Sequence, residues 1–233
     1  MTQEKDAKKK IGAVLVVGGG VAGIQASLDL ADSGFRVYLI DKGSSIGGVM
    51  AQLDKTFPTN DCSMCILSPK LVATGRHPNI TILTNAEVTG LKGKAGNFEV
   101  KLRKKSRYII EDKCSGCGVC AQKCPIEVVD SYNEGLGKRS AIYVEYPQAV
   151  PLKYMIDREK CIGCGTCFEV CKANAVKYDQ EDSETILKVG SIILAPGFEP
   201  FDARLKSEYG YGRFANVVTS IEFERILSAS GPY

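Results

Sequence analysis

Eight of the ten cysteines lie in two runs that repeat one spacing. Each run reads C-x2-C-x2-C-x3-C, the spacing by which four thiolates hold a cubane iron–sulfur cluster, with the fourth cysteine of a run bound to the other cluster. We expect three sulfurs of a run to wrap one face of a cluster from a tight loop, and the fourth cysteine to open a following helix. The predicted ligands of one [4Fe–4S] cluster are Cys114, Cys117, Cys120 and Cys171, and those of a second are Cys161, Cys164, Cys167 and Cys124.

Glycines between these cysteines support the prediction. Gly116, Gly118, Gly163 and Gly165 suit loops that must bend sharply and keep side chains away from sulfide. A disulfide framework or paired zinc sites would also use many cysteines, but two copies of a four-cysteine run favour clusters. The stretch is typical of a two-cluster ferredoxin module.

The composition limits the remaining functions. The chain has 233 residues, a formal net charge of +3 and one histidine, so neither a nucleic acid partner nor histidine-based catalysis is favoured. Residues 1–10 form a polar tail without the apolar core of a signal peptide, and no apolar run approaches the roughly 18 residues of a membrane span. Ten cysteines without an export signal indicate a reducing compartment, and we predict a cytoplasmic protein.

A glycine-rich turn follows the first apolar segment. The apolar run 11–17 leads into G-x-G-x-x-G, an amphipathic segment and a second apolar run, 36–40, which ends at Asp41. This pattern predicts a β-turn-α-β unit in which helix-terminal N–H groups receive a pyrophosphate and the acid takes a ribose hydroxyl. An ordinary parallel βαβ unit is the alternative. The predicted contacts at the turn are Gly18, Gly20, Val21, Ala22 and Gly23.

The pattern continues beyond Asp41 with a five-residue gap and Gly47-Gly48. In this extended form it resembles the FAD-binding end of the two-dinucleotide flavoprotein superfamily. Ala195-Pro196-Gly197, after the apolar strand 191–194, resembles the A-T-G-x-x-P motif of the same superfamily, with proline in place of threonine. The resemblance implies an α/β, Rossmann-like, thioredoxin-reductase-like FAD-binding domain. It adds FAD contacts at Asp41, Lys42, Gly47, Gly48, Val88, Ala195, Pro196 and Gly197.

The domain order follows from these two modules. Segments 79–83, 87–91 and 97–103 alternate or run apolar between turns and predict a β-meander, while 175–178 and 185–189 predict a closing β pair. We expect a polar tail at 1–10, the first part of the FAD-binding domain at 11–106, an inserted α+β ferredoxin domain at 107–180 and the rest of the FAD-binding domain at 181–233. The segment between the two cysteine runs, 127–158, is longer than a minimal ferredoxin requires.

Three further features stand outside these modules. Cys62 and Cys65 form a C-x2-C pair that cannot close a cluster alone, so they could be a redox-active dithiol beside the flavin, two ligands of a further cluster shared with a partner, or buried structural thiols. His77 is expected in a loop, without a ligand or base role. The basic run Lys101, Arg103, Lys104, Lys105 and Arg107 reads most simply as a solvated strand end, or else as a surface that steers an acidic ferredoxin-type partner.

The combined motifs resemble the N-terminal half of the heterodisulfide reductase A-type flavoprotein, the flavin component of electron-bifurcating complexes in methanogens and anaerobes. The match rests on the glycine pattern 18–48, on D-C-S-M-C-I-L-S-P-K at 61–70, on the inserted cysteine runs and on 216–232, where a strand and a capped helix are expected. The resemblance implies an oxidoreductase subunit that passes electrons between a donor, FAD and [4Fe–4S] clusters. The partners that it implies are other heterodisulfide-reductase-like subunits, a hydrogenase, formate or NADH dehydrogenase unit, and ferredoxin.

The sequence also departs from that family. The second nucleotide domain and the late Gly-Asp dipeptide of such flavoproteins have no counterpart here, so the FAD domain is expected to be incomplete and a second chain to supply the C-terminal half. Two other functions remain open: an electron-relay module without its own catalytic site, and a subunit of a quinone-interacting complex.

Overall fold

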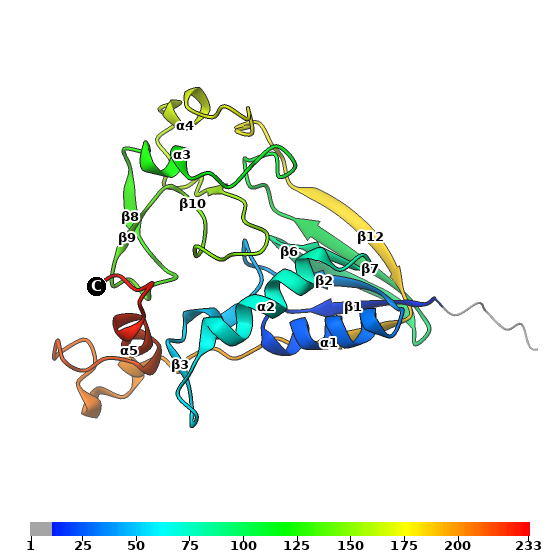
Figure 1. Ribbon diagram of the computed structural model, residues 1–233, viewed down its shortest axis with the longest axis horizontal. Coiled ribbons are helices and arrows are strands. Elements are labelled where there is room, and N and C mark those ends of the chain that lie inside the picture. The colour runs from blue at the N-terminus through cyan, green and yellow to red at the C-terminus, as the bar shows by residue number, and fades with distance from the viewer. Residues whose placement is uncertain (1–10) are drawn as a thin grey trace, which may run out of the picture.

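The computed structural model describes residues 11–233, and the predicted polar tail lies outside them. One layer is a parallel sheet of order β13-β1-β2-β5. Helices α1 and α2 cross in front of this sheet in Figure 1. The elements of this layer are β1 (Ala13–Val17), α1 (Val21–Asp32), β2 (Arg36–Ile40), α2 (Ser63–Arg76), β5 (Ile80–Leu83) and β13 (Ser191–Leu194).

The apolar content of the central strands explains this layer. Leu15 and Val16 on β1 are fully buried, and Ile24 on α1 is buried on the face toward the sheet. Strand β13 pairs in parallel with β1, with Leu194 opposite Val17. The distant segment 191–194 therefore rejoins the N-terminal unit, as the FAD-domain resemblance implies.

The prediction that segment 79–83 is the first strand of a β-meander is wrong, because this segment, β5, belongs to the parallel sheet. It pairs in parallel with β2 instead of preceding β6 in an antiparallel sheet. The reason is α2, which lies between β2 and β5 and returns the chain to the same edge, as a helical crossover does. Alternation within 79–83 could not distinguish these two pairings.

An antiparallel sheet packs on the other side of the parallel one. Its order is β12-β7-β6, and Val100, Leu102 and Val189 share a buried cluster with Leu15 and Ile40. Its strands are β6 (Ala86–Lys94), β7 (Asn97–Lys104) and β12 (Ser183–Val189).

The prediction that segments 175–178 and 185–189 form a closing β pair is wrong, because the second segment lies in β12. It pairs with β7 along its full length, while segment 175–178 forms only an isolated bridge between Val176 and Ile109. Leu187 and Val189 of β12 therefore pack in the core of the flavin-type domain, and the inserted segment closes without this strand.

The inserted segment stands at the top of Figure 1, above the parallel sheet. Its core is small and contains Ile109, Ile142, Ile156 and Ala175, with six of the cysteines packed into or against it. The division at 106/107 and 180/181 stays our proposal. The elements are α3 (Val119–Gln122), β8 (Glu127–Val129), β9 (Lys138–Ser140), β10 (Ile142–Tyr143), β11 (Met155–Ile156) and α4 (Thr166–Glu169).

Helix α5 (Ser220–Leu227) lies close to the loop that follows the second glycine pair, and begins with the expected capping box. The Thr219 hydroxyl accepts from the Glu222 N–H, and the Glu222 carboxylate accepts from the Thr219 N–H. The prediction of a strand just before this helix is wrong, because residues 216–219 have no regular secondary structure. The remaining short elements are η1 (Gly48–Gln52), β3 (Lys55–Thr56), β4 (Asp61–Cys62), η2 (Ala203–Leu205) and η3 (Ser207–Tyr209).

The basic run is mostly paired within the chain. Lys101, Arg103 and Lys104 form ion pairs with Glu184, Glu87 and Glu111. The prediction that Arg107 belongs to a solvated strand end is wrong, because only 1% of the surface of this residue is exposed. Among residues 11–233, no helix has the length and apolarity to cross a bilayer.

Candidate nucleotide and cluster sites

The glycine-rich turn leaves no space for side chains at its first and last glycines. A Cβ on Gly23 would lie 1.8 Å from the carbonyl oxygen of Gly18, and a Cβ on Gly18 would lie 2.0 Å from that of Ala195. Gly18 has φ +108°. Because helix α1 starts at Val21 with Gly20 as its N-cap, its free N–H groups open at this turn, where an anionic diphosphate can bind.

Asp41 directly follows β2 and lies beside this turn. Its Oδ2 accepts from the Gly19 N–H at 2.6 Å and its Oδ1 from the Gly43 N–H at 2.7 Å. The carboxylate therefore ties the turn to the loop that follows β2. This is the position from which an acid reaches a ribose hydroxyl in dinucleotide folds.

The second glycine pair packs directly on the first turn. The Gly47 N–H donates to the Gly19 carbonyl at 2.7 Å, and a Cβ on Gly48 would lie 2.9 Å from the Gly20 Cα. A cavity of about 250 Å³ opens beside this contact, with Asp41, Gly43, Gly48 and Tyr146 among its lining residues. Glycines that a Cβ would obstruct, a free helix N-terminus and a carboxylate at the strand end fit a dinucleotide such as FAD.

The other predicted FAD contacts lie at varying distances from this cavity. Lys42 lines it and is largely exposed, with its Nζ 4.0 Å from a Glu199 carboxylate oxygen. Pro196 and Gly197 are exposed in the turn after β13, and Gly197 has φ +71°. Val88 is exposed on β6 and is not among the lining residues, so its contact stays a prediction.

The cysteines predicted to hold the second cluster surround one small cavity of about 10 Å³. Cys161, Cys164 and Cys167 line it together with Cys124, the fourth cysteine of the other run. The remaining lining side chains are largely apolar, among them Ile142 and Ile156. This arrangement fits the predicted exchange of the fourth cysteine, because a thiol from the first run faces three from the second.

The first predicted set is looser. Burial raises the pKa of Cys120 most, and the charges of Cys114 and Cys117, and of Cys167 from the other run, raise it further. Cys171 packs against the same apolar cluster as Cys114 and Cys120, and its Sγ accepts from the Ala175 N–H at 3.3 Å. Its place as the fourth ligand stays a prediction.

The two runs share one local geometry. Gly116 and Gly163 both have φ +72°, while Gly118 and Gly165 have φ +84° and +82°. In each run the third cysteine sits inside a four-residue helix and the fourth follows its end, at Cys124 and Cys171. The expectation that the fourth cysteine opens a helix is therefore wrong, because the left-handed glycine before the third cysteine already starts one.

The thiols are not electrostatically equivalent. Burial raises the pKa of Cys120 to about 12 and raises that of Cys167. A hydrogen bond from the Val119 backbone lowers the pKa of Cys117, and the side chain and backbone of Thr166 lower that of Cys164. Each run thus offers a shielded sulfur and an exposed one.

A single metal ion fits these residues poorly. Within 11–233, no three histidine, cysteine, aspartate or glutamate side chains are placed to hold one ion. In a cubane each thiolate binds a different iron, so the ligands stand farther apart than those of a zinc ion. The donor set, eight cysteines in two C-x2-C-x2-C-x3-C runs, is the set that pairs of cubane clusters use.

Cys62 and Cys65 lie at the start of α2, away from the cysteine runs in sequence and in packing. Their sulfurs are bonded to each other, Cys65 is exposed and Cys62 is half-buried. The interpretation as buried structural thiols is therefore wrong. His77 caps the end of α2 in a loop, with Nε2 3.2 Å from an Asp32 oxygen.

Several residues near the nucleotide cavity were missed by sequence reasoning. Ser131, Tyr132, Glu145 and Tyr146 all line it, and all come from the inserted segment. The one feature of the sequence that could have indicated them is the length of segment 127–158, which exceeds what a minimal ferredoxin requires. Nothing in the spacing of these four residues indicates that they reach the flavin-type domain.

Comparisons with known proteins agree with both sites. Residues 13–108 match the family described as FAD dependent oxidoreductase, and residues 113–176 match the family described as 4Fe-4S dicluster domain. These matches support FAD and [4Fe–4S] clusters as cofactors.

Curated relatives extend the match across both regions. The A-type component of the H2/formate:CoB-CoM heterodisulfide,ferredoxin reductase of Methanococcus maripaludis is 59% identical over 94% of this chain and 33% of that protein. One of the A-type iron-sulfur components of the CoB-CoM heterodisulfide reductase of Methanopyrus kandleri is 59% identical with the same coverage. The chain thus spans about a third of the length of these relatives. Among solved structures, a thioredoxin reductase from T. acidophilum is 23% identical over 41% of this chain and 31% of its own, with a TM-score of 0.34.

Proposed function

The chain belongs to the A-type family of heterodisulfide reductase components, over the N-terminal third of its members, and from this premise we propose that it is the FAD and [4Fe–4S] electron-transfer part of an oxidoreductase complex. The observation that carries the proposal is the union of both sites in one chain. The cavity beside Asp41 and the cavity around Cys161 are built on domains that share a buried polar interface at Arg107.

FAD would supply two-electron chemistry and the clusters one-electron transfer between a donor and an acceptor. The residues of this chain bind and shield these groups. The glycine turn and the start of α1 hold the diphosphate, Asp41 holds a ribose, and the cysteine loops hold the clusters. We extend the proposal to flavin-based electron bifurcation in the cytoplasm, with a hydrogenase, formate or NADH dehydrogenase unit and ferredoxin as partners.

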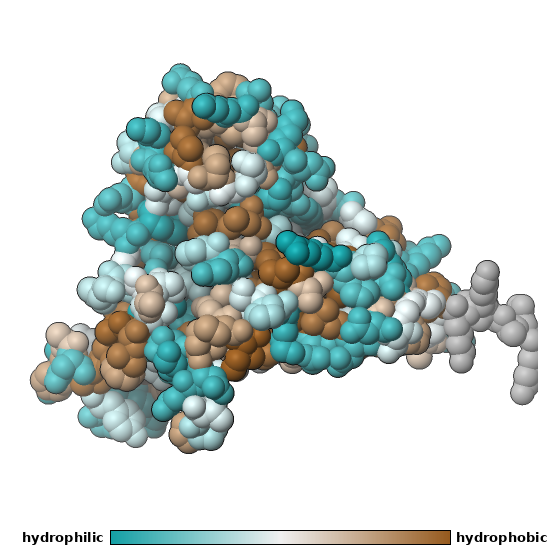
Figure 2. Space-filling view, viewed as in Figure 1, coloured by the Kyte–Doolittle hydropathy of each residue, from teal (hydrophilic) through white to brown (hydrophobic). Residues whose placement is uncertain are grey.

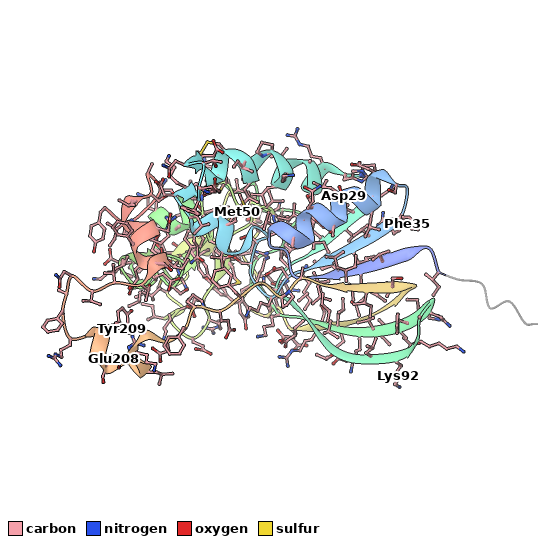
Figure 3. All side chains as sticks on the ribbon, turned by 90° about the horizontal axis from the view of Figure 1, so that it is seen from below. Asp29, Phe35, Met50, Lys92, Glu208 and Tyr209 are labelled. Atoms are coloured by element: carbon pink, nitrogen blue, oxygen red, sulfur yellow. A yellow bond between two sulfur atoms is a disulfide. The ribbon has the colours of Figure 1, made fainter. Side chains whose placement is uncertain are left out.

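An exposed apolar surface supports the proposal that a further part of the protein packs here and completes the flavin site. From the end of β13 onward, large apolar side chains face outward, although such patches are normally covered. Figure 2 shows hydrophobic residues gathered near α5, and Figure 3 shows Tyr209 on a segment that extends away from the sheets. The side chains are Leu194, Phe198, Phe201, Leu205, Tyr209, Phe214, Phe223 and Leu227. We propose that the remaining two thirds of the family's full-length protein cover this surface and complete the FAD site.

We also propose a role for Cys62 and Cys65. At the start of α2, Cys65 is exposed and Cys62 is half-buried, so the pair lies at the surface of the chain. As thiolates they would supply two ligands of a further [4Fe–4S] cluster, with the other ligands from the partner. Their disulfide is the two-electron-oxidised form of this pair, and it must be reduced to two thiolates before either sulfur can bind iron.

The cysteine exchange gives a direct test of the proposed cluster sites. Replacing Cys124 with alanine should disturb the cluster bound by Cys161, Cys164 and Cys167, although Cys124 belongs to the other run. Electron paramagnetic resonance of the reduced protein separates the two clusters, and Glu127→Ala is the matched control, because Glu127 is an exposed residue of the same domain without a proposed ligand role. Loss of the signal from the first cluster instead, with the second intact, would contradict the assignment.

A further inference from the structure

The loop between Asp41 and β3, residues 43–52, is held by the inserted segment along most of its length. The Ile46 N–H donates to the Val150 carbonyl at 2.8 Å, and the Gln52 side chain donates to the Tyr132 carbonyl at 2.9 Å. This loop contains the second glycine pair, which packs on the nucleotide-binding turn. Its position therefore depends on a domain that is separate in sequence.

Glu145 makes the central contact with this loop. One carboxylate oxygen, Oε2, accepts from the hydroxyl of Ser44 and from that of Ser45, both at 2.9 Å. Both serines are buried, and Glu145 is half-buried at the cavity wall. Hydrogen bonds to a charged acceptor are stronger than neutral ones, so this carboxylate fixes two successive residues of the loop.

Glu145 and Asp41 both hold the start of this loop, and their carboxylates both lie near Gly43. A Cβ on Gly43 would lie 3.1 Å from Asp41 Oδ1 and 3.6 Å from Glu145 Oε2. Asp41 bonds the backbone of Gly43, and Glu145 bonds the side chains of the next two residues. The segment that leads to the glycine pair is thus held by a carboxylate of each domain.

Two tyrosines of the inserted segment continue this contact. Tyr146 donates its hydroxyl to the Ile46 carbonyl and Tyr132 donates to the Ala51 carbonyl. Their rings stack with centroids 5.4 Å apart. A Cβ on Gly47 would lie 2.4 Å from the Tyr146 hydroxyl, so the glycine is required here by the inserted domain as well as by its φ of +135°.

We propose that the inserted domain is a structural part of the FAD site and that Glu145 is its positioning residue, which holds the 43–52 loop in the nucleotide-binding conformation through Ser44 and Ser45. The proposal rests on the proposed binding of FAD by this chain. Because binding couplings are reciprocal, occupancy of the FAD site also stabilises the inserted domain against the loop.

The test compares alanine and glutamine at position 145 in the anaerobically purified protein together with its co-purifying partner. Glu145→Ala removes the one oxygen that accepts both hydrogen bonds, whereas Glu145→Gln keeps a carbonyl oxygen for the two hydroxyls. We expect the dissociation constant for FAD, titrated by flavin fluorescence, to rise about tenfold or more in Glu145→Ala, which corresponds to about 1.4 kcal/mol. Glu145→Gln should stay within about threefold of the original protein, and iron content should not change in either.

Glu127→Ala is the matched control, because Glu127 is a glutamate of the same domain with 69% of its side chain exposed. Unchanged FAD affinity in Glu145→Ala with iron retained would overturn the proposal, and so would equal losses in the alanine and glutamine variants. If Glu145→Ala fails to fold, Ser45→Ala removes one donor without altering the inserted domain. It should weaken FAD binding about threefold, and no loss there would also overturn the proposal.

A second readout does not require FAD. Hydrogen exchange of the backbone in 43–52 should be faster in Glu145→Ala than in Glu127→Ala, because the loop has lost its contact with the inserted domain. If the original protein binds no FAD under any condition, the proposed function fails, while slower exchange in the original protein still shows that Glu145 holds the loop. Equal exchange in both variants would refute the positioning role by itself.

Discussion

Tyr178 is placed to set the reduction potential of one cluster. Its hydroxyl oxygen lies 3.0 Å from the Sγ of Cys167, one of the sulfurs at the cavity that Cys124 completes. A cluster-bound thiolate has no proton, so the tyrosine must donate this hydrogen bond. Burial, followed by its bond with Cys167, raises the pKa of Tyr178, so the hydroxyl keeps its proton at neutral pH.

The size of the effect follows from the strength of one hydrogen bond. Such a bond contributes about 0.5–1.5 kcal/mol, and about 59 mV corresponds to 1.4 kcal/mol for a one-electron couple. Because the reduced cluster carries more negative charge on its sulfurs, the donor stabilises the reduced state. Tyr178→Phe should therefore lower the potential of this cluster by about 20–60 mV.

The assay is an anaerobic redox titration followed by electron paramagnetic resonance. Tyr154→Phe is the matched control, because Tyr154 lies beside the first run, with its hydroxyl 3.0 Å from the Cβ position of Gly118. That variant should leave the potential of the second cluster unchanged. The reasoning is refuted if Tyr178→Phe has no effect on the second cluster, raises its potential, or shifts only the first cluster.

Three further predictions concern stability and binding. Arg225→Met should destabilise the protein by about 2–4 kcal/mol in urea unfolding, because Arg225 is fully buried and donates to Asn133, Gln52 and Ser230. The control Arg204→Met should not destabilise it, because Arg204 is exposed. Equal urea midpoints for the two variants would contradict this prediction. Burial alone would raise the pKa of Glu111, but the hydrogen bond and charge of Lys104 and the charge of Arg107 outweigh it and lower that pKa. Ionised Glu111 thus stabilises the protein above its unfolded-state pKa, and this stability is lost as pH falls through the lower folded-state pKa. The difference in urea midpoint between the original protein and Glu111→Gln should therefore shrink as pH falls through that window. A difference that stays constant with pH would contradict this prediction. Gly23→Ala should abolish FAD binding or folding, since its Cβ would lie 1.8 Å from the Gly18 carbonyl, whereas the open Gly12→Ala should bind FAD normally; normal binding by Gly23→Ala would reject the packing argument.

The sequence predicted the parts of the fold that local chemistry determines. Strands 36–40 and 191–194 begin and end as expected, because both are short apolar runs bounded by turn residues. The positive φ of the glycines between the cysteines follows from their spacing. The capping box at Thr219 is equally local, and it is present.

Pairings between distant segments could not be predicted in the same way. Strand β12 alternates like any half-exposed strand, and only the space beside β7 decides its partner. Arg107 sits in a basic run and looks solvated, yet its guanidinium reaches Ser44 and Thr84 in the other domain. Glu145 likewise has no motif, because its role depends on a loop one hundred residues earlier in the chain.

The most direct test of the account is the FAD and iron content of the anaerobically purified chain, alone and with its partner. We predict about eight irons per chain without FAD when it is alone, and FAD only in the complex. After subtraction of the partner's own clusters, about twelve irons in the complex would place a further cluster at Cys62 and Cys65, and about eight would leave them as thiols or a disulfide. FAD retained by the lone chain would contradict the shared flavin site, and a complex without FAD or with far fewer than eight irons would contradict the central claim.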